Sequence, residues 1–109
     1  MDIADVYKYF QSPPKPQYLN KEQTICYISK SLLENDLCAT ELIVLVQSST
    51  RALSSTILSE SLVILLESNI INSYIEKIKG KGRSRKMFTI IPEMKPQAEE
   101  LANFWDNIA

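Results

Sequence analysis

The residues best suited to bind a ligand form one basic segment. Six of the twelve Lys and Arg residues lie between positions 77 and 86, where the chain has no Asp or Glu. They are Lys77, Lys79, Lys81, Arg83, Arg85 and Lys86. Outside this segment the chain has six basic residues and all thirteen acidic residues, so that part has a formal charge of −7. A positive run on an acidic body is typical of an anion-binding patch, often one for nucleic acid, although a solvated polar loop would have the same composition.

Residues for other chemistry are sparse. The chain has no His, which excludes Ser-His-Asp and Cys-His catalysis and zinc sites that need imidazole. Cys26 and Cys38 form no C-x-x-C motif, and we expect reduced, mostly buried thiols that pack in the core. Gly80-Lys81 lacks the upstream Gly and the following Ser or Thr of a phosphate-binding loop. These observations predict a protein that is not an enzyme and that uses no cofactor and no metal.

Length and composition predict one folded domain over residues 1–109. The chain has 109 residues, of which 45% are hydrophobic, and a net charge of −1, which disfavours disorder. No apolar run approaches the roughly 20 residues that span a bilayer. Residues 1–5 are acidic and do not resemble the start of a signal peptide. We expect a cytoplasmic protein with no membrane partner.

The first elements are helical. Apolar residues at helical spacing predict an amphipathic helix over residues 2–11, within an N-terminal segment 1–12, and a Pro-rich linker follows at 13–19. A second helix over 20–34 has Asn20 as its N-cap and Gln23 at the capping-box position. The apolar run after Thr40 suits a buried strand or a short buried helix, and Thr40 as a cap favours a helix over 40–47.

A third core helix is predicted over residues 51–68. Leu58, Leu62, Leu65 and Leu66 line one side of it, and Ser and Thr residues line the other. Small hydroxyl side chains allow close approach to a partner and hydrogen-bond to phosphates and bases, although a plain solvent-exposed face would also be polar. Asn69 suits the left-handed conformation that ends a helix.

The basic segment is placed on a β-hairpin. Strands are predicted over 73–79 and 85–91, and the loop between them, 80–84, holds both glycines of the chain. A last helix over 96–108, within a C-terminal segment 95–109, has an apolar stripe. Residues 20–91 would then form the core of the domain.

This order of elements resembles a winged helix-turn-helix domain, specifically MarR- and PadR-like transcriptional regulators. Residues 40–43 are similar to the start of the first motif helix and 55–62 to the recognition helix. Residues 66–71 resemble the helix end of these regulators, with Asn69 where Gly commonly stands, and 82–90 resemble their wing. The turn between the motif helices, 47–53, is longer than usual. The expected fold class is mainly α with a small β-hairpin (α+β), a winged helix-turn-helix with flanking N- and C-terminal helices.

The resemblance implies binding to double-stranded DNA. In such domains the recognition helix enters the major groove and the wing lies against the backbone or minor groove. Carried over by position, the groove-side candidates are Arg51, Ser54, Ser55, Thr56 and Ser59. The wing candidates are Lys79, Lys81, Arg83, Arg85 and Lys86. Glu60 lies on the same helix face, where it would accept from a cytosine amine or lie just outside the contact zone.

The resemblance also implies a homodimer, because terminal helices form the dimer in these families. The candidate interface residues are Ile3, Val6, Tyr7, Phe10, Leu101, Phe104, Trp105 and Ile108. Packing of both terminal helices on their own core is the alternative. Two other functions stay open: a protein-interaction or assembly module, which the acidic pI near 5.4 favours, and a DNA binder associated with replication or partition. No residues indicate an effector ligand.

Overall fold

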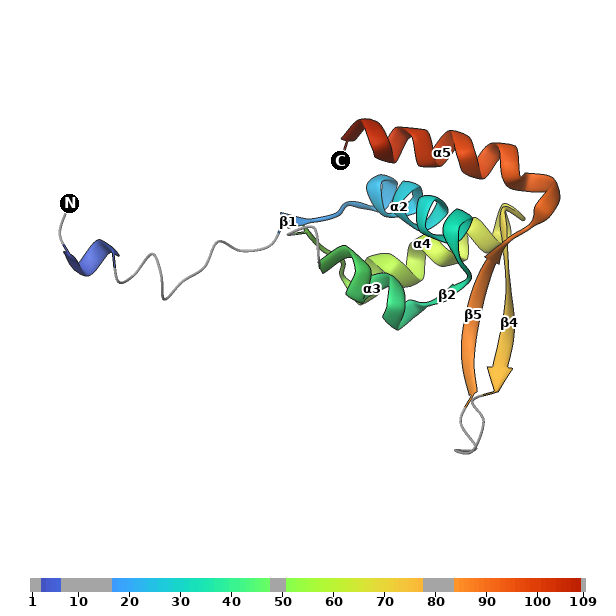
Figure 1. The fold of residues 1–109 in the computed structure, drawn as a ribbon, viewed down its shortest axis with the longest axis horizontal. Helices are drawn as coiled ribbons and strands as arrows, with labels where there is room; N and C mark the ends of the chain where they lie inside the picture. The colour runs from blue at the N-terminus through green and yellow to red at the C-terminus, as the bar shows by residue number, and fades with distance from the viewer. Residues whose placement is uncertain (1–2, 7–16, 48–50, 78–83, 109) are drawn as a thin grey trace.

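The computed structural model describes residues 3–6, 17–47, 51–77 and 84–108, and its fold is the predicted one: mainly helical with a small antiparallel sheet (Figure 1). Residues 3–6 are helical, within the predicted N-terminal helix. Tyr7, Phe10 and the Pro-rich residues 12–16 lie outside the described residues. Three helices, α2 (Lys21–Glu34), α3 (Ala39–Gln47) and α4 (Ser55–Glu67), form the body. The C-terminal helix α5 (Lys95–Ile108) follows a single 3-10 turn, Pro92–Met94.

Helix α2 begins with the predicted capping box. The Gln23 amide donates to the Asn20 side chain at 2.8 Å, and the Asn20 amide donates to the Gln23 side chain at 3.1 Å. Two amides that lack an intrahelical partner are thereby satisfied. The N-terminus of this helix is therefore encoded locally.

Helix α3 confirms the helical alternative for the apolar run, with two corrections. It begins at Ala39, so Thr40 lies inside its first turn; Glu41 instead accepts from the Cys38 amide at 3.2 Å and satisfies the helix start. The helix is also only half buried. Leu42 and Val46 lie in the core, whereas Val44 and Leu45 are 58% and 49% exposed.

Helix α4 begins four residues later than predicted. Arg51–Ala52 is a short strand, β3, which pairs in parallel with β1 (Gln17–Tyr18). Ser54 then caps α4, because its hydroxyl accepts from the Ile57 amide at 3.3 Å. The prediction of a helix from Arg51 was wrong because helical periodicity carries no information about a strand partner far away in the chain.

The end of α4 confirms the role predicted for Asn69. Its φ of 57° lies in the left-handed region. The Ile70 amide donates to the Leu65 carbonyl and the Asn69 amide to the Leu66 carbonyl, both at 3.1 Å. These two bonds form a Schellman motif, which turns the chain from α4 into the hairpin.

The sheet has the order β2-β5-β4 and is antiparallel, with β2 at Leu37–Cys38, β4 at Ile71–Lys77 and β5 at Ser84–Ile90. The predicted hairpin is confirmed, with the first strand two residues earlier than expected and the second one residue earlier. β4 and β5 project away from the helices (Figure 1). The two-residue strand β2 was not predicted, because it is too short to show a pattern.

One hydrophobic core joins the three body helices to the base of the hairpin. Its most completely buried side chains include Ile28, Leu42, Leu58, Leu65 and Ile71, and Phe88 of β5 closes it. Helix α5 lies along α2 on the outside of the body (Figure 1) and buries Ala98 and Ala102. This core holds α4 and the hairpin in fixed relation to each other.

Candidate nucleic-acid interface

The exposed face of α4 has the hydroxyl side chains that the sequence placed there. Ser55, Thr56 and Ser59 are exposed, and their hydroxyl groups form no hydrogen bond within the described part of the chain. Ser54 differs from them, because its hydroxyl is engaged in capping the helix. The helix therefore presents three small polar side chains to solvent.

Glu60, the acidic residue of this face, lies next to a cation. The Lys21 ammonium is 3.1 Å from the Glu60 carboxylate, and both side chains are about half exposed. The pair joins the start of α2 to α4 and offsets the negative charge of Glu60. The charge of this acidic residue is thus compensated by a lysine of another helix.

Arg51 lies apart from α4. It belongs to β3, and its guanidinium carbon is 5.2 Å from the centroid of the Trp105 ring. This is a cation–π contact between β3 and α5. It directs Arg51 toward α5, whereas the sequence placed the residue on the groove side of a helix.

The hairpin has two different faces, because side chains of a strand alternate. Cross-strand pairing places Ile75 opposite Lys86 and Lys77 opposite Ser84 on one face. Lys77 and Lys86 are exposed and have no ion pair with a carboxylate in residues 3–6, 17–47, 51–77 or 84–108. The Lys86 ammonium lies 5.7 Å from the centroid of the Phe88 ring. Lys79, Lys81 and Arg83 lie outside the described residues.

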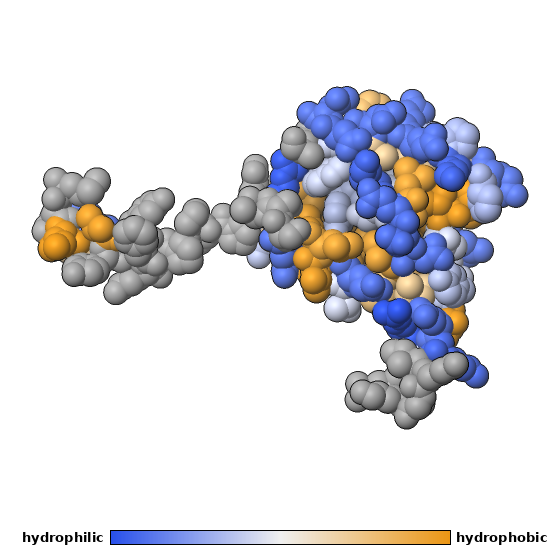
Figure 2. Space-filling model, viewed as in Figure 1, coloured by the Kyte–Doolittle hydropathy of each residue, from blue (hydrophilic) through white to orange (hydrophobic). Residues whose placement is uncertain are grey.

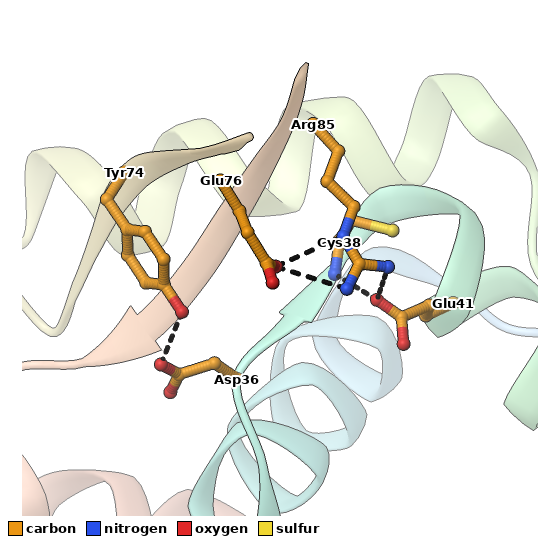
Figure 3. Close-up of polar contacts among 6 residues, drawn as sticks. All are labelled: Asp36, Cys38, Glu41, Tyr74, Glu76 and Arg85. Carbon is orange, nitrogen blue, oxygen red and sulfur yellow. Dashed lines mark hydrogen bonds and ion pairs between the residues drawn. The ribbon is translucent and has the colours of Figure 1, made fainter. Parts of the chain in front are cut away.

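The other face of the hairpin carries a polar cluster (Figure 3). Arg85 lies opposite Glu76, and its Nε and Nη2 are both 3.1 Å from Glu76 Oε2. Its Nη1 is 3.3 Å from Oε1 of Glu41 on α3. The hydrogen bond to Glu76, and then its charge, raise the pKa of Arg85. Hydrogen bonds from the Cys38 thiol and amide, with a smaller effect of Arg85, lower the pKa of Glu41.

A second polar contact extends this cluster along β4. The Tyr74 hydroxyl donates to the Asp36 carboxylate at 2.8 Å (Figure 3), and this hydrogen bond raises the pKa of Tyr74. This polar cluster was not predicted from the sequence. The pairing of Glu76 with Arg85 follows from the hairpin register, whereas Glu41 and Asp36 are brought there only by the tertiary fold.

The predicted interface residues of α5 fall into two groups. Leu101 and Trp105 pack against the core of the same chain, and the Trp105 ring lies 5.3 Å from that of Tyr27. Phe104 is 54% exposed and lines a shallow groove of about 400 Å³ with residues of α2, including Gln23 and Cys26. The alternative of packing within one chain therefore applies to Leu101 and Trp105. Ile3 and Val6 are 68% and 37% exposed, and the side chain of Ile108 lies outside the described residues.

The surface of the body is mixed. Figure 2 shows apolar side chains over α3, where Val44 and Leu45 are exposed, whereas α5 on the opposite side of the body is largely hydrophilic. Cys26 and Cys38 are free and partly exposed, less buried than predicted, and burial raises the pKa of Cys26.

The described residues contain no group of three or more His, Cys, Asp or Glu side chains that would hold a metal ion. None of the helices in the described part of the chain is long and apolar enough to cross a membrane.

Comparison with solved structures decides the family. The Pex protein of Anabaena, described as circadian clock associated, is 40% identical, with a TM-score of 0.81 over 99% of this chain and 95% of its own. The chain belongs to the Pex family. Pex of Synechococcus is 34% identical, with a TM-score of 0.86 over 99% of this chain and 97% of its own. No protein-family model and no curated protein sequence matches the chain.

The chain also shares its fold with PadR-type regulators. A PadR-family transcription regulator from Clostridium difficile is 22% identical, with a TM-score of 0.66 over 78% of this chain and 88% of its own. This likeness confirms the winged-helix fold and the resemblance to PadR-like proteins. These relatives are described as a clock-associated protein and a transcription regulator and not as enzymes, in agreement with the sequence prediction.

Proposed function

We propose that this member of the Pex family is a transcriptional regulator that binds double-stranded DNA as a homodimer. In this proposal α4 enters the major groove and the hairpin β4–β5 lies against the backbone or minor groove. The observation that carries it is the exposure on α4 of hydroxyl side chains that have no hydrogen-bond partner among the described residues, in a body that also projects a basic hairpin (Figure 1). The description of PadR-fold neighbours as transcription regulators supports it.

The proposed base contacts come from Ser55, Thr56 and Ser59. Their side chains are short, so the helix backbone would approach the base edges closely, and each hydroxyl both donates and accepts. Because Lys21 pairs with Glu60, the Glu60 carboxylate would repel the DNA phosphates less strongly. Ser54 would act through its cap, at the N-terminus of α4, where backbone amides favour a phosphate.

The proposed phosphate contacts are the basic residues of the wing. Lys86 is exposed and forms no ion pair with a carboxylate of the described residues. Lys79, Lys81 and Arg83 would extend the same charge to the tip. An arginine near the tip would also suit a narrow A·T minor groove, where the negative potential is enhanced.

The proposed dimer uses the apolar surface left exposed at the ends of the chain. Phe104 and the groove between α5 and α2 form one part, and the N-terminal helix with Ile3 and Val6 forms the other. The proposal also includes Tyr7, Phe10 and Ile108. A two-fold dimer would present two copies of α4 about one DNA turn apart.

The salt dependence of duplex binding tests the proposal. Replacing Lys81 and Lys86 with Ala should weaken binding to all duplexes alike and flatten the plot of log affinity against log salt by about 0.9 for each lost phosphate contact. Lys95→Ala is the matched control, because Lys95 is an exposed lysine at the start of α5, outside the hairpin and outside the proposed dimer surface. If the double variant binds with unchanged affinity and slope, the hairpin is not a DNA wing, and the protein-interaction hypothesis takes its place.

The cellular role follows from the same proposal. A DNA-binding regulator would act in the cytoplasm, where the chromosome of a bacterium lies. Because the Anabaena relative is described as circadian clock associated, we extend an association with the circadian clock to this chain. Comparing transcript rhythms between cells with and without the protein would test that extension.

A further inference from the structure

We propose that Arg85 is a positioning residue that clamps the wing to the start of α3 and makes no contact with DNA phosphate. The clamp consists of Arg85, Glu76 and Glu41 (Figure 3). It differs from the prediction that placed Arg85 among the DNA-binding residues of the wing. The consequence for DNA binding rests on the proposed function, whereas the orientation of the wing does not.

The geometry of the clamp joins two separate elements through one guanidinium group. Nε and Nη2 bind Glu76 on the neighbouring strand, and Nη1 binds Glu41, which is 44 positions away in sequence. Glu41 is itself held in place, since it accepts from the Cys38 amide at 3.2 Å. A planar guanidinium with several donors in fixed directions suits this bridging role. The outer part of the hairpin is therefore attached to the helical body through Arg85.

The clamp lies where the hairpin would otherwise be free to tilt. Among the described strands, β2 supports β5 only at Met87 and Phe88, and β4 has β5 as its single neighbour. Beyond that support the wing is a two-stranded ribbon, which has little stability of its own. Tyr74 bound to Asp36 ties β4 to the segment before β2 on the same face. Together the two contacts hold both strands of the wing.

The charge of the clamp argues against a phosphate contact. One guanidinium lies between two carboxylates, so the three side chains have a net charge of −1 at neutral pH. Three of the five guanidinium N–H donors are directed at Glu76 and Glu41, so a phosphate could approach only the two that remain, beside two carboxylates that repel it. Counterion release on DNA binding depends on cations that are free to neutralise phosphates, and Lys86, on the opposite face of the hairpin, meets that condition.

The orientation of the wing can be measured without DNA. Spin labels would be placed at the exposed positions Lys77 and Glu99 by Lys77→Cys and Glu99→Cys, in a chain with Cys26→Ala and Cys38→Ser. Mixing with an excess of unlabelled chain ensures that a dimer contains at most one labelled chain, so only the distance between the two labels within one chain is measured. Pulsed dipolar spectroscopy then reports the distance between the wing and α5. We expect a broadened or shifted distribution in Arg85→Gln and in Glu41→Gln, and an unchanged one in Lys86→Gln.

Thermal unfolding separates orientation from loss of fold. If Arg85→Gln is unfolded, Glu41→Gln provides the test, because it weakens one contact of the clamp and keeps Arg85 with Glu76. The proposal would be overturned if Arg85→Gln or Glu41→Gln is folded and has the same distance distribution as the labelled chain that keeps both Arg85 and Glu41. The lysine control shows whether removal of any wing cation alters the distance.

Titration with duplex DNA at several salt concentrations completes the test. Arg85→Gln should lower affinity about fivefold or more through the lost wing orientation and leave the salt slope unchanged, whereas Lys86→Gln should flatten the slope by about 0.9. A slope flattened by Arg85→Gln with an unchanged distance distribution would make Arg85 a phosphate contact and overturn the inference. If the unsubstituted chain does not bind DNA, the proposed function fails, while the distance measurement still decides whether the clamp exists.

Discussion

Ser54 and Ser59, five positions apart at the start of α4, have different environments, so their substitution should affect different properties of the protein. Ser54 accepts from the Ile57 amide, whereas Ser59 is exposed. Ser54→Ala should lower the free energy of unfolding by about 1 kcal/mol through loss of the cap. Ser59→Ala should leave stability within about 0.5 kcal/mol, as for surface sites, and narrow the affinity gap between a preferred and a random duplex by about 1–3 kcal/mol. Denaturant unfolding and duplex titration of both variants check this; a Ser59→Ala chain with full sequence preference would remove Ser59 from the interface.

Asn69 provides a second prediction at the residue scale. A left-handed φ of 57° is strained for residues with a Cβ atom and unstrained for Gly. Asn69→Gly should therefore raise the free energy of unfolding by a few tenths to about 1 kcal/mol, and Asn69→Ala should lower it by about 1 kcal/mol. Urea unfolding of the pair measures both changes. Equal stability of the Gly and Ala variants would show that the Schellman turn does not constrain this position.

At the scale of elements, the packing of α5 on α2 depends on Trp105. The ring contacts Tyr27 and the Arg51 guanidinium, so it joins α5 to both α2 and β3. Because the ring is half buried, Trp105→Ala should cost about 2 kcal/mol of unfolding free energy, less than a fully buried aromatic residue. Asn103→Ala, at an exposed position of the same helix outside the proposed dimer surface, is the control and should change the free energy of unfolding by no more than about 0.5 kcal/mol. Thermal unfolding of the two variants measures the difference, and equal losses would contradict this account of the helix.

At the scale of the whole molecule, the proposed dimer can now be tested at a better position than Trp105. Trp105→Asp would damage the fold of a single chain as well as an interface, whereas Phe104 is 54% exposed. Phe104→Asp should therefore leave the monomer folded and dissociate the dimer, because a charge in a desolvated interface is costly. Sedimentation should give twice the chain mass of 12.4 kDa for the unsubstituted protein and the chain mass for the variant. An unsubstituted protein that sediments only as a monomer at micromolar concentration would contradict the dimer.

Local patterns in the sequence determined most of the elements and their order. The capping box at Asn20, the left-handed turn at Asn69 and the periodicity of the leucines in α4 act within a few residues, so they can be recognised without knowledge of the fold. The same holds for the hairpin, whose strands flank the two glycines. Together these elements were sufficient to indicate a winged helix.

Only the tertiary structure decided which polar residues are free to bind. The strands β2 and β3 are two residues long and exist because distant segments pair with them, so the start of α4 and the place of Arg51 could not be predicted. Glu41 contacts the wing from the start of α3, and Asp36 contacts it from the segment before β2. These partners could not be predicted from the run of basic residues, because they are distant in the sequence. Arg85 and Lys86 are adjacent cations in the sequence and lie on opposite faces of the hairpin, because a strand alternates its side chains. One is held between two carboxylates, and the other remains open to solvent.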